Sequence, residues 1–340
     1  MKALLVLMVA VLSFFLTGAV LRYAIARRLL DHPNERSSHV APTPRGGGVA
    51  IVVMFCVAVA WLAAIGRLAP GPAIALIGAG SWVALVGFID DHRHVSARLR
   101  LCAHFIAAAW ALYWIAGLAP LTVFGVDLRL GWFGNIVAAI FLVWVLNLYN
   151  FMDGIDGIAG IEAVTVAIGG AFLWWLTTTS DEALVPLLLA AASAGFLAWN
   201  FPPARIFMGD VGSGFLGLEL AVFAVWSAHE GVRLFWCWVI LLGVFIVDST
   251  ITLIRRVLRG ERFYEAHRSH AYQYAARHFG QHRLVALSVG VINVAWLLPV
   301  ATLVALEAID GVIGVLVAYA PLVWLALRFN AGVKETPARS

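Results

Sequence analysis

The chain has 340 residues, of which 62% are hydrophobic and only 12% are charged, and its formal net charge is +4. A soluble domain carries about 25% charged residues, so this composition lacks the polar surface of a water-soluble fold. The basic residues lie between apolar runs and form no dense block, which argues against a nucleic-acid partner and indicates a membrane protein. Three isolated cysteines predict neither a disulfide framework nor a zinc site.

Apolar runs along the chain are long enough to cross a lipid bilayer, for which about twenty residues are needed and about seventeen suffice. They predict an all-α, polytopic membrane protein of about eleven helices, in a single domain over residues 1–340. We expect these helices near residues 3–22, 49–66, 72–89, 101–117, 133–150, 158–177, 183–199, 213–228, 234–254, 284–305 and 308–328.

The distribution of positive charge predicts the orientation of these helices. The first apolar run has Lys2 before it and three arginines soon after it, the reverse of a secretory signal, so we expect a retained helix. With the N-terminus in the periplasm, 19 of the 23 basic residues fall in cytoplasmic loops or the C-terminal tail. The positive-inside rule predicts such an asymmetry. An odd number of crossings then places the C-terminus in the cytoplasm.

Polar side chains gather in four clusters at the helix ends of this cytoplasmic face. They are Asp90 and Asp91; Asn147, Asn150, Asp153 and Asp156; the loop 200–210; and His267 with His270. A single polar cluster at a helix end often meets only water. Four clusters on one face, far apart in sequence, indicate a functional site that helix packing assembles.

Glycine-flanked aspartates indicate the chemistry of this site. Asp153 and Asp156 lie in NLYNFMDGIDGIAG, and Asp210 lies in FMGDVGSG at the start of a predicted helix. Carboxylates without thiolates suit Mg2+, which keeps water and phosphate oxygens in its shell. Glycines let the backbone approach a ligand, and a helix N-terminus favours phosphate. The sequence predicts a magnesium–pyrophosphate site, with Arg45 and Arg268 available for further phosphate charge.

Five motifs in order resemble those of the polyprenyl-phosphate N-acetylhexosamine-1-phosphate transferases. They are DHPNERSSHVAPTPRGGG, GFIDDHRHVSARLR, NLYNFMDGIDGIAG, NFPPARIFMGDVGSGFLG and RGERFYEAHRSHAYQ, and they span most of the chain. The ending HRSHAYQ is most similar to the bacterial branch that begins O-antigen and related surface glycans. The resemblance implies transfer of a sugar-1-phosphate from a UDP-N-acetylhexosamine to undecaprenyl phosphate, with release of UMP.

The resemblance also implies a role for each matching residue. Asp90 and Asp91 match the catalytic acidic pair and additional metal ligands, and Asp210 matches the aspartate that binds Mg2+, or Mn2+ as an alternative. The implied substrate-binding residues are Asn147, Asn150, Asp153, Gly154, Ile155, Asp156, Asn200, Phe207, Arg45 and Arg268, with Asn200 and Phe207 holding the uridine. His267 and His270 match a histidine motif that contacts the diphosphate or the sugar.

Two departures from the family pattern qualify this assignment. His94 stands where a third acidic residue often follows the aspartate pair, which puts a metal role for that position in doubt. The histidine motif is interrupted by Arg268 and Ser269, which argues against the muramoyl-pentapeptide branch. The resemblance further implies a bacterial inner-membrane location with a cytoplasmic active site, and it allows a homodimer.

Some assignments stay open at the level of sequence. Asp248 and Glu219 lie inside predicted helices, where a carboxylate is costly unless it is paired or faces a cavity. Asp248 could face the sugar or pair with Arg255 or Arg256. Two other functions are an ion-coupled transporter, which would need polar residues near the bilayer midplane and often inverted repeats, and an inactive scaffold. The identity of the sugar is also open among N-acetylglucosamine, N-acetylfucosamine and N-acetylquinovosamine.

Overall fold

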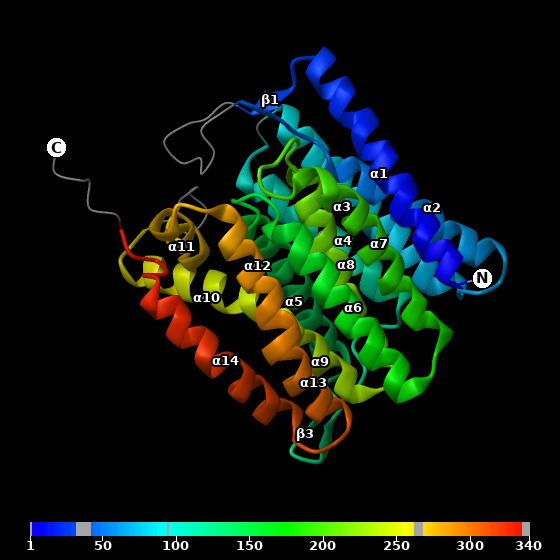
Figure 1. Ribbon diagram of the computed structural model, residues 1–340. Helices are drawn as coiled ribbons and strands as arrows, with labels where there is room; N and C mark the ends of the chain where they lie inside the picture. Colours follow the sequence, from blue (N-terminus) through cyan, green and yellow to red (C-terminus); the bar gives the residue numbers. More distant parts are fainter. Residues whose placement is uncertain (1, 32–41, 94, 262–267, 335–340) are drawn as a thin grey trace.

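The computed structural model describes residues 2–31, 42–93, 95–261 and 268–334, and helices make up most of it (Figure 1). Its helices are α1 (Lys2–Ala26), α2 (Gly48–Ala64), α3 (Pro70–His92), α4 (Ala97–Trp114), α5 (Gly131–Met152), α6 (Ile158–Thr178), η1 (Asp181–Ala183), α7 (Leu184–Asn200), α8 (Asp210–Ser227), α9 (Val232–Leu241), α10 (Gly243–Leu258), α11 (Ala271–Phe279), α12 (His282–Ile292), the π-helix η2 (Asn293–Leu297), α13 (Leu298–Ala305) and α14 (Gly311–Arg328).

Within the described residues, eight helices are long and apolar enough to cross a membrane, or nine if the bent pair α9–α10 counts as one span. This confirms a polytopic, mainly helical membrane protein. The other two predicted spans are also helical, but α2 has only 17 residues and α4 carries two arginines in its first turn. The count of eleven spans therefore stays a prediction.

Two short antiparallel strand pairs accompany the helices of this mainly α-helical fold. β1 (Leu30–Asp31) pairs with β2 (Thr43–Pro44), and β3 (Leu121–Val123) pairs with β4 (Val126–Leu128). Between β3 and β4, Phe124 and Gly125 have φ values of 50° and 75°. Positive φ at both central residues is what a tight two-residue hairpin turn requires. Such local pairing is invisible to a search for long apolar runs.

The ninth predicted helix, 234–254, is wrong as a continuous helix. The structure divides it at Leu242, and α9 and α10 meet at 66°. Gly243 stands at the bend, where a Cβ atom would lie 2.8 Å from the Tyr319 ring of α14. The Tyr319 hydroxyl in turn donates to the Val239 carbonyl at 2.6 Å. Packing against α14 at a residue without a side chain therefore accommodates the bend.

Helix α8 forms the centre of the bundle. Every residue from Val211 to Ser227 is buried, including the Glu219 carboxyl, and most of these residues are apolar, as in other helices at the core of a bundle. It packs against α2, α3, α5 and α9. The ends of α3, α5 and α7 and the beginnings of α6 and α8 consequently lie at one end of the bundle, which brings the sequence motifs together.

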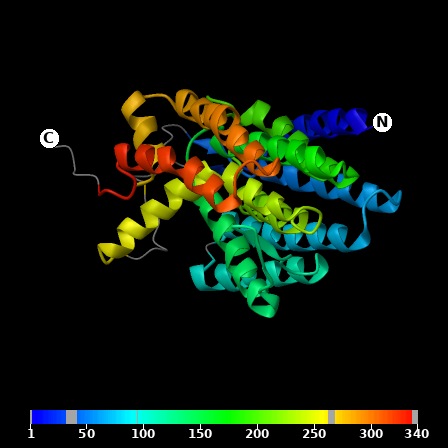
Figure 2. The same ribbon diagram turned by 90° about the horizontal axis from the view of Figure 1, so that it is seen from below.

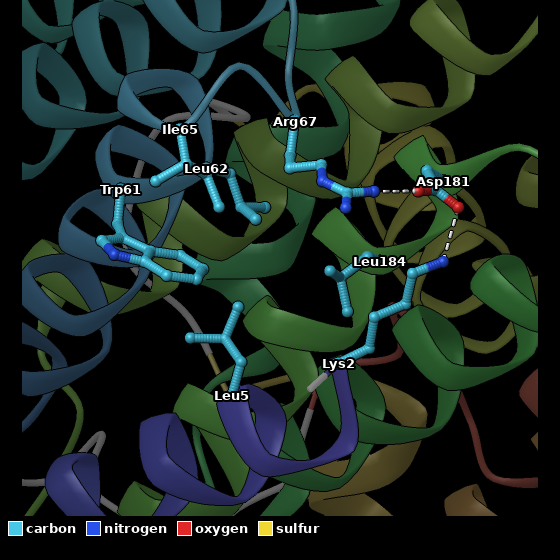
Figure 3. A pocket seen from close by; sticks show the side chains of 8 residues that line it. All are labelled: Lys2, Leu5, Trp61, Leu62, Ile65, Arg67, Asp181 and Leu184. Atoms are coloured by element: carbon cyan, nitrogen blue, oxygen red, sulfur yellow. Dashed lines mark hydrogen bonds and ion pairs between the residues drawn. The ribbon is translucent and has the colours of Figure 1, made fainter.

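Exposed ion pairs lie at the opposite end of the bundle. Asp181 of η1 accepts from Lys2 of α1 and from Arg67, whose Nη1 lies 3.4 Å from the carboxylate (Figure 3). Arg233 pairs with Glu307 at the same end. Helices α1 and α14 run in the same direction through the bundle (Figures 1 and 2), as an odd number of crossings would require.

Candidate active site

A cavity of about 240 Å³ opens at the end of the bundle where the motifs meet. Its lining comes from β1, the β2–α2 connection, the ends of α3, α5 and α7, the α5–α6 and α7–α8 connections, the first residue of α8, and α11 and α12. The residues are Asp31, Arg45, Asp91, Asn150, Asp153, Gly154, Ile155, Asp156, Asn200, Phe207, Met208, Gly209, Asp210, Gln273 and His282. Five of these side chains are carboxylates, so the cavity is strongly acidic.

Ten of the residues singled out in the sequence line this cavity: Arg45, Asp91, Asn150, Asp153, Gly154, Ile155, Asp156, Asn200, Phe207 and Asp210. Four others in the described part of the chain, Asp90, Asn147, Arg268 and His270, are not among its lining residues. His267, like His94, lies outside the described residues. The β2–α2, α5–α6 and α7–α8 connections, which carry three of the sequence motifs, therefore meet at one cavity.

Asp91 holds the N-terminus of α8. Its carboxylate accepts from the backbone N–H groups of Asp210 and Val211 at 3.2 and 3.3 Å. Gly209 precedes them with a φ of 77°, and a Cβ there would lie 2.6 Å from Asp91 Oδ2. Only glycine combines this backbone conformation with so close an approach. Arg45 Nη1 lies 4.0 Å from the same carboxylate. Asp91 thus fixes where Asp210 begins its helix.

Asp90 organises the connection between α3 and α4. Its carboxylate accepts from the Val95 N–H at 2.8 Å and forms an ion pair with Arg100 of α4. The same Arg100 nitrogen, Nη1, lies 3.4 Å from Asp210 Oδ2. Arg100 therefore joins two of the three aspartates that the sequence predicts as metal ligands.

The α5–α6 connection places two aspartates at the cavity, and their carboxylates differ in their hydrogen bonds. Asp156 accepts from the Ala204 N–H at 3.0 Å and faces His282 Nδ1 at 3.4 Å. The Asp153 carboxylate accepts no hydrogen bond from any described residue. Burial, followed by the negative charges of Asp210, Asp91 and Asp156, raises the pKa of Asp153 well above its ordinary value. A cation in the cavity would relieve this repulsion.

Helix α11 supplies a wall of the cavity that the sequence did not predict. Asp248 of α10 accepts from the N–H groups of Ala271 and Tyr272, both at 2.9 Å, and so anchors the first turn of α11. The Tyr272 hydroxyl donates to the Phe151 carbonyl at 3.0 Å. A Cβ on Gly154 would lie 2.2 Å from that hydroxyl, so the glycine makes this approach feasible. Asp248 therefore supports the cavity through α11.

Asn200 and Phe207 form the rim near the α7–α8 loop. Asn200 Oδ1 accepts from the Gly157 N–H at 3.0 Å, and its Nδ2 donates to the Ile206 carbonyl at 2.9 Å. Its amide thereby ties the α5–α6 connection to the α7–α8 loop. Phe207 exchanges backbone hydrogen bonds with the β2–α2 connection, donating to Pro44 and accepting from Gly47. This pairing fixes the backbone from which the ring lines the cavity.

The contacts of His270 position the N-terminus of α11. It is buried, it caps the N-terminus of α11, and its Nδ1 lies 3.4 Å from Asp248 Oδ1. Arg268 is exposed, and its carbonyl accepts from Arg277. Asn147 donates to the Val143 carbonyl of its own helix at 2.6 Å. The predicted catalytic role of His270 stays a prediction.

Comparison with known proteins decides the family. Residues 73–228 match a family model described as glycosyl transferase family 4. The chain is 31% identical over 278 residues to a phospho-N-acetylmuramoyl-pentapeptide-transferase of Moorella thermoacetica, covering 75% of this chain and 84% of that protein. The chain belongs to the polyprenyl-phosphate hexosamine-1-phosphate transferase family.

Other relatives in this family carry names with different acceptors and sugars. A probable undecaprenyl-phosphate N-acetylglucosaminyl 1-phosphate transferase of Bacillus subtilis is 29% identical, over 82% of this chain and 78% of that protein. A decaprenyl-phosphate N-acetylglucosaminephosphotransferase of Mycolicibacterium smegmatis is 28% identical, over 85% and 80%. The matches therefore include both the muramoyl-pentapeptide type, against which the interrupted histidine motif argues, and the N-acetylglucosamine type.

The donor groups of this transferase fit a hard divalent cation. Among the described residues, no three histidine, cysteine, aspartate or glutamate side chains are arranged to hold one metal ion. Mg2+ does not need such a cage, because it usually binds through one or two carboxylates together with water and substrate phosphates. A cationic nitrogen of Arg100 already lies between Asp90 and Asp210. A positive group is thus accommodated between these two carboxylates.

Five lining residues were not assigned a site role from the sequence: Asp31, Gln273 and His282, and also Met208 and Gly209, which lie within the predicted cluster 200–210. Gly209 and Gln273 lie inside motifs that carry the family resemblance. Their closeness in sequence to Asp210 and His270 could therefore have identified them as site residues. His282 begins α12 outside every motif and reaches the cavity only through its contact with Asp156. Nothing local to its sequence predicts that contact.

Proposed function

We propose that the chain transfers N-acetylhexosamine-1-phosphate from a UDP-sugar to undecaprenyl phosphate, forming undecaprenyl-diphospho-sugar and UMP. The acidic cavity at one end of the membrane bundle carries this proposal, because it combines Asp210 and Asp153 with Phe207 and Arg45. The names of the Bacillus and Mycolicibacterium relatives support a polyprenyl-phosphate acceptor. In this proposal, the cavity faces the cytoplasm of a bacterial inner membrane, and the reaction begins an O-antigen or related surface glycan.

Several side chains at or next to the cavity have a role in this proposal. Asp90 is not among the lining residues, but it shares Arg100 with Asp210. Mg2+ bound through Asp210 and Asp90, with Asp91 beside them, would neutralise charge that develops on the diphosphate. Phe207 offers a ring face on which uracil can stack. Arg45 provides a guanidinium suited to phosphate oxygens. Asp153, which accepts no hydrogen bond among the described residues, is available to a substrate hydroxyl or to water on the cation.

A single displacement accounts best for this arrangement. A phosphate monoester has a second pKa of about 6, so the lipid phosphate is already largely a dianion at neutral pH. It attacks the phosphorus that bears the sugar, and the bond to UMP breaks. A two-step route would need Asp90 or Asp91 as a nucleophile, yet Asp91 is buried and its two oxygens accept backbone N–H groups. Positioning and charge neutralisation supply most of the catalysis in phosphoryl transfer.

The test follows UMP release from purified protein supplied with undecaprenyl phosphate, Mg2+ and a panel of UDP-N-acetylhexosamines. We expect one sugar to support rapid UMP release, and Asp210→Asn to reduce the rate by at least about a hundredfold, as loss of key transition-state stabilisation does. Without the lipid acceptor, the single displacement predicts no stoichiometric burst of UMP. If no sugar yields UMP with the folded wild-type protein, the proposed function is wrong.

A further inference from the structure

We propose that the Arg100 guanidinium occupies the place of the divalent cation between Asp90 and Asp210 in the ligand-free protein and leaves when the cation binds. The inference rests on the proposed magnesium-dependent function. It gives Arg100 a regulatory role at that site, as an internal competitor of the metal. Neither the apolar pattern nor the glycine-flanked aspartates single out this residue.

The geometry places one nitrogen against two carboxylates. Nη1 of Arg100 forms the ion pair with Asp90 and also lies 3.4 Å from Asp210 Oδ2. The Asp90 side chain is only 9% exposed, whereas those of Arg100 and Asp210 are 30% and 33% exposed. Solvent therefore reaches the Arg100 and Asp210 side chains but hardly reaches Asp90. A dissolved cation can reach Asp210 without unfolding the site.

Electrostatics explains why Arg100 lies there. It follows Ser96, the N-cap of α4, by four residues. The partial positive charge at a helix N-terminus disfavours a cation in that region, so α4 itself offers Arg100 no electrostatic benefit. The two carboxylates supply the attraction. Without a cation they would repel one another, together with Asp91 and Asp153 in the same cavity.

Competition with a metal follows from the space available. Mg2+ binds carboxylate oxygens at about 2.0–2.1 Å and keeps several waters, so it cannot share the interval between Asp90 and Asp210 with a guanidinium nitrogen. Binding of the ion between these two carboxylates would therefore break both Arg100 contacts. The alternative is that Arg100 stays in place and the cation binds farther into the cavity, through Asp153 or Asp156. These two arrangements predict opposite effects of removing the Arg100 charge.

The first experiment measures Mn2+ binding by electron paramagnetic resonance, in detergent and without UDP-sugar. Arg100→Met should bind Mn2+ at least about tenfold more tightly than the wild type, because a neighbouring opposite charge typically shifts the proton affinity of a carboxyl tenfold or more. Arg100→Lys, which keeps the charge, should stay near the wild type. Arg98→Met is the matched control, since Arg98 is exposed on the same helix. Unchanged or weaker binding in Arg100→Met would overturn the proposal.

A second measurement uses the wild-type protein, so it does not depend on a variant that folds. Phenylglyoxal modifies accessible arginines, and mass spectrometry can follow Arg100 and Arg98 separately. Saturating Mn2+ should increase the modification rate of Arg100 several-fold and leave that of Arg98 unchanged. An equal or slower rate at Arg100 would show that the guanidinium is not released.

The two proposals can fail separately. If the wild type releases UMP but Mn2+ neither frees Arg100 nor binds more tightly to Arg100→Met, only the competition is wrong. If Mn2+ frees Arg100 while no UDP-sugar yields UMP, the competition stands as a property of the site and the proposed reaction is wrong.

Discussion

At the scale of single residues, the aspartates of the cavity are not equivalent. The Asp91 carboxylate accepts hydrogen bonds from the first N–H groups of α8. The Asp90 carboxylate accepts from the Val95 N–H and forms an ion pair with Arg100. Asp153 accepts no hydrogen bond from the described residues, and burial followed by the neighbouring negative charges raises its pKa. The resemblance treats Asp90 and Asp91 alike as a catalytic pair. Their contacts instead distinguish them: Asp91 sets the geometry of the α8 N-terminus, whereas Asp90 forms an ion pair with Arg100.

Phe207 gives the prediction at this scale. Phe207→Ala should raise the Michaelis constant for the UDP-sugar about five- to a hundredfold, because stacking of a base on an aromatic ring contributes about 1–3 kcal/mol. The turnover number should change much less, since the uracil is remote from the breaking bond. Steady-state kinetics and direct UMP binding provide the measurement.

Phe201→Ala serves as the control for this substitution. Its ring contacts the Arg283 guanidinium at 5.6 Å and is not among the residues that line the cavity. It should therefore leave the Michaelis constant near the wild-type value. Equal UMP affinity in Phe207→Ala and the wild type would mean that Phe207 only packs.

At the scale of elements, α11 shows how a short amphipathic helix is held in place by a carboxylate from another helix. Asp248 accepts from the first N–H groups of α11, which otherwise have no intrahelical partner. Thr252 also donates to Asp248, at 3.1 Å. Gln273 on α11 then lines the cavity. The buried carboxylate thus connects α10 with the helix that lines the cavity.

Asp248→Ala should destabilise this connection. It removes the acceptor for two buried N–H groups, each of which costs about 1–3 kcal/mol when left unpaired. We expect a lower thermal midpoint in detergent and faster hydrogen exchange over residues 271–279. Thr252→Val is the matched control, because it removes one bond to Asp248 and leaves both backbone bonds intact. Unchanged exchange in Asp248→Ala would contradict the anchoring role.

At the scale of the whole molecule, the distribution of basic residues and the position of the cavity predict one orientation of the bundle in the membrane. The cavity lies at one end, and Asp181 with its two basic partners lies at the other (Figure 3). By the positive-inside rule, the excess of arginine on the cavity side predicts that this side faces the cytoplasm. The gathering of the motif residues at one end of the bundle also disfavours a transporter.

Cysteine labelling tests this orientation in spheroplasts. In a background without Cys56, Cys102 and Cys237, Arg129→Cys should react with a membrane-impermeant maleimide from outside, because residue 129 is exposed beyond β4. Arg98→Cys should react only after lysis. The reverse pattern would show that the cavity faces the periplasm.

The sequence by itself determined the membrane class, the helical spans to within a few residues and most of the cavity-lining motif residues. It could do so because hydrophobicity acts over a local window, and because polar residues at the ends of packed helices must meet on one face. Only the tertiary structure decided the bend at Leu242, the helix α11, the place of His282 and the Arg100 bridge. Each of these depends on a contact between different segments of the chain, such as Tyr319 with Val239 or Arg100 with Asp210. No window of sequence contains both partners of such a contact.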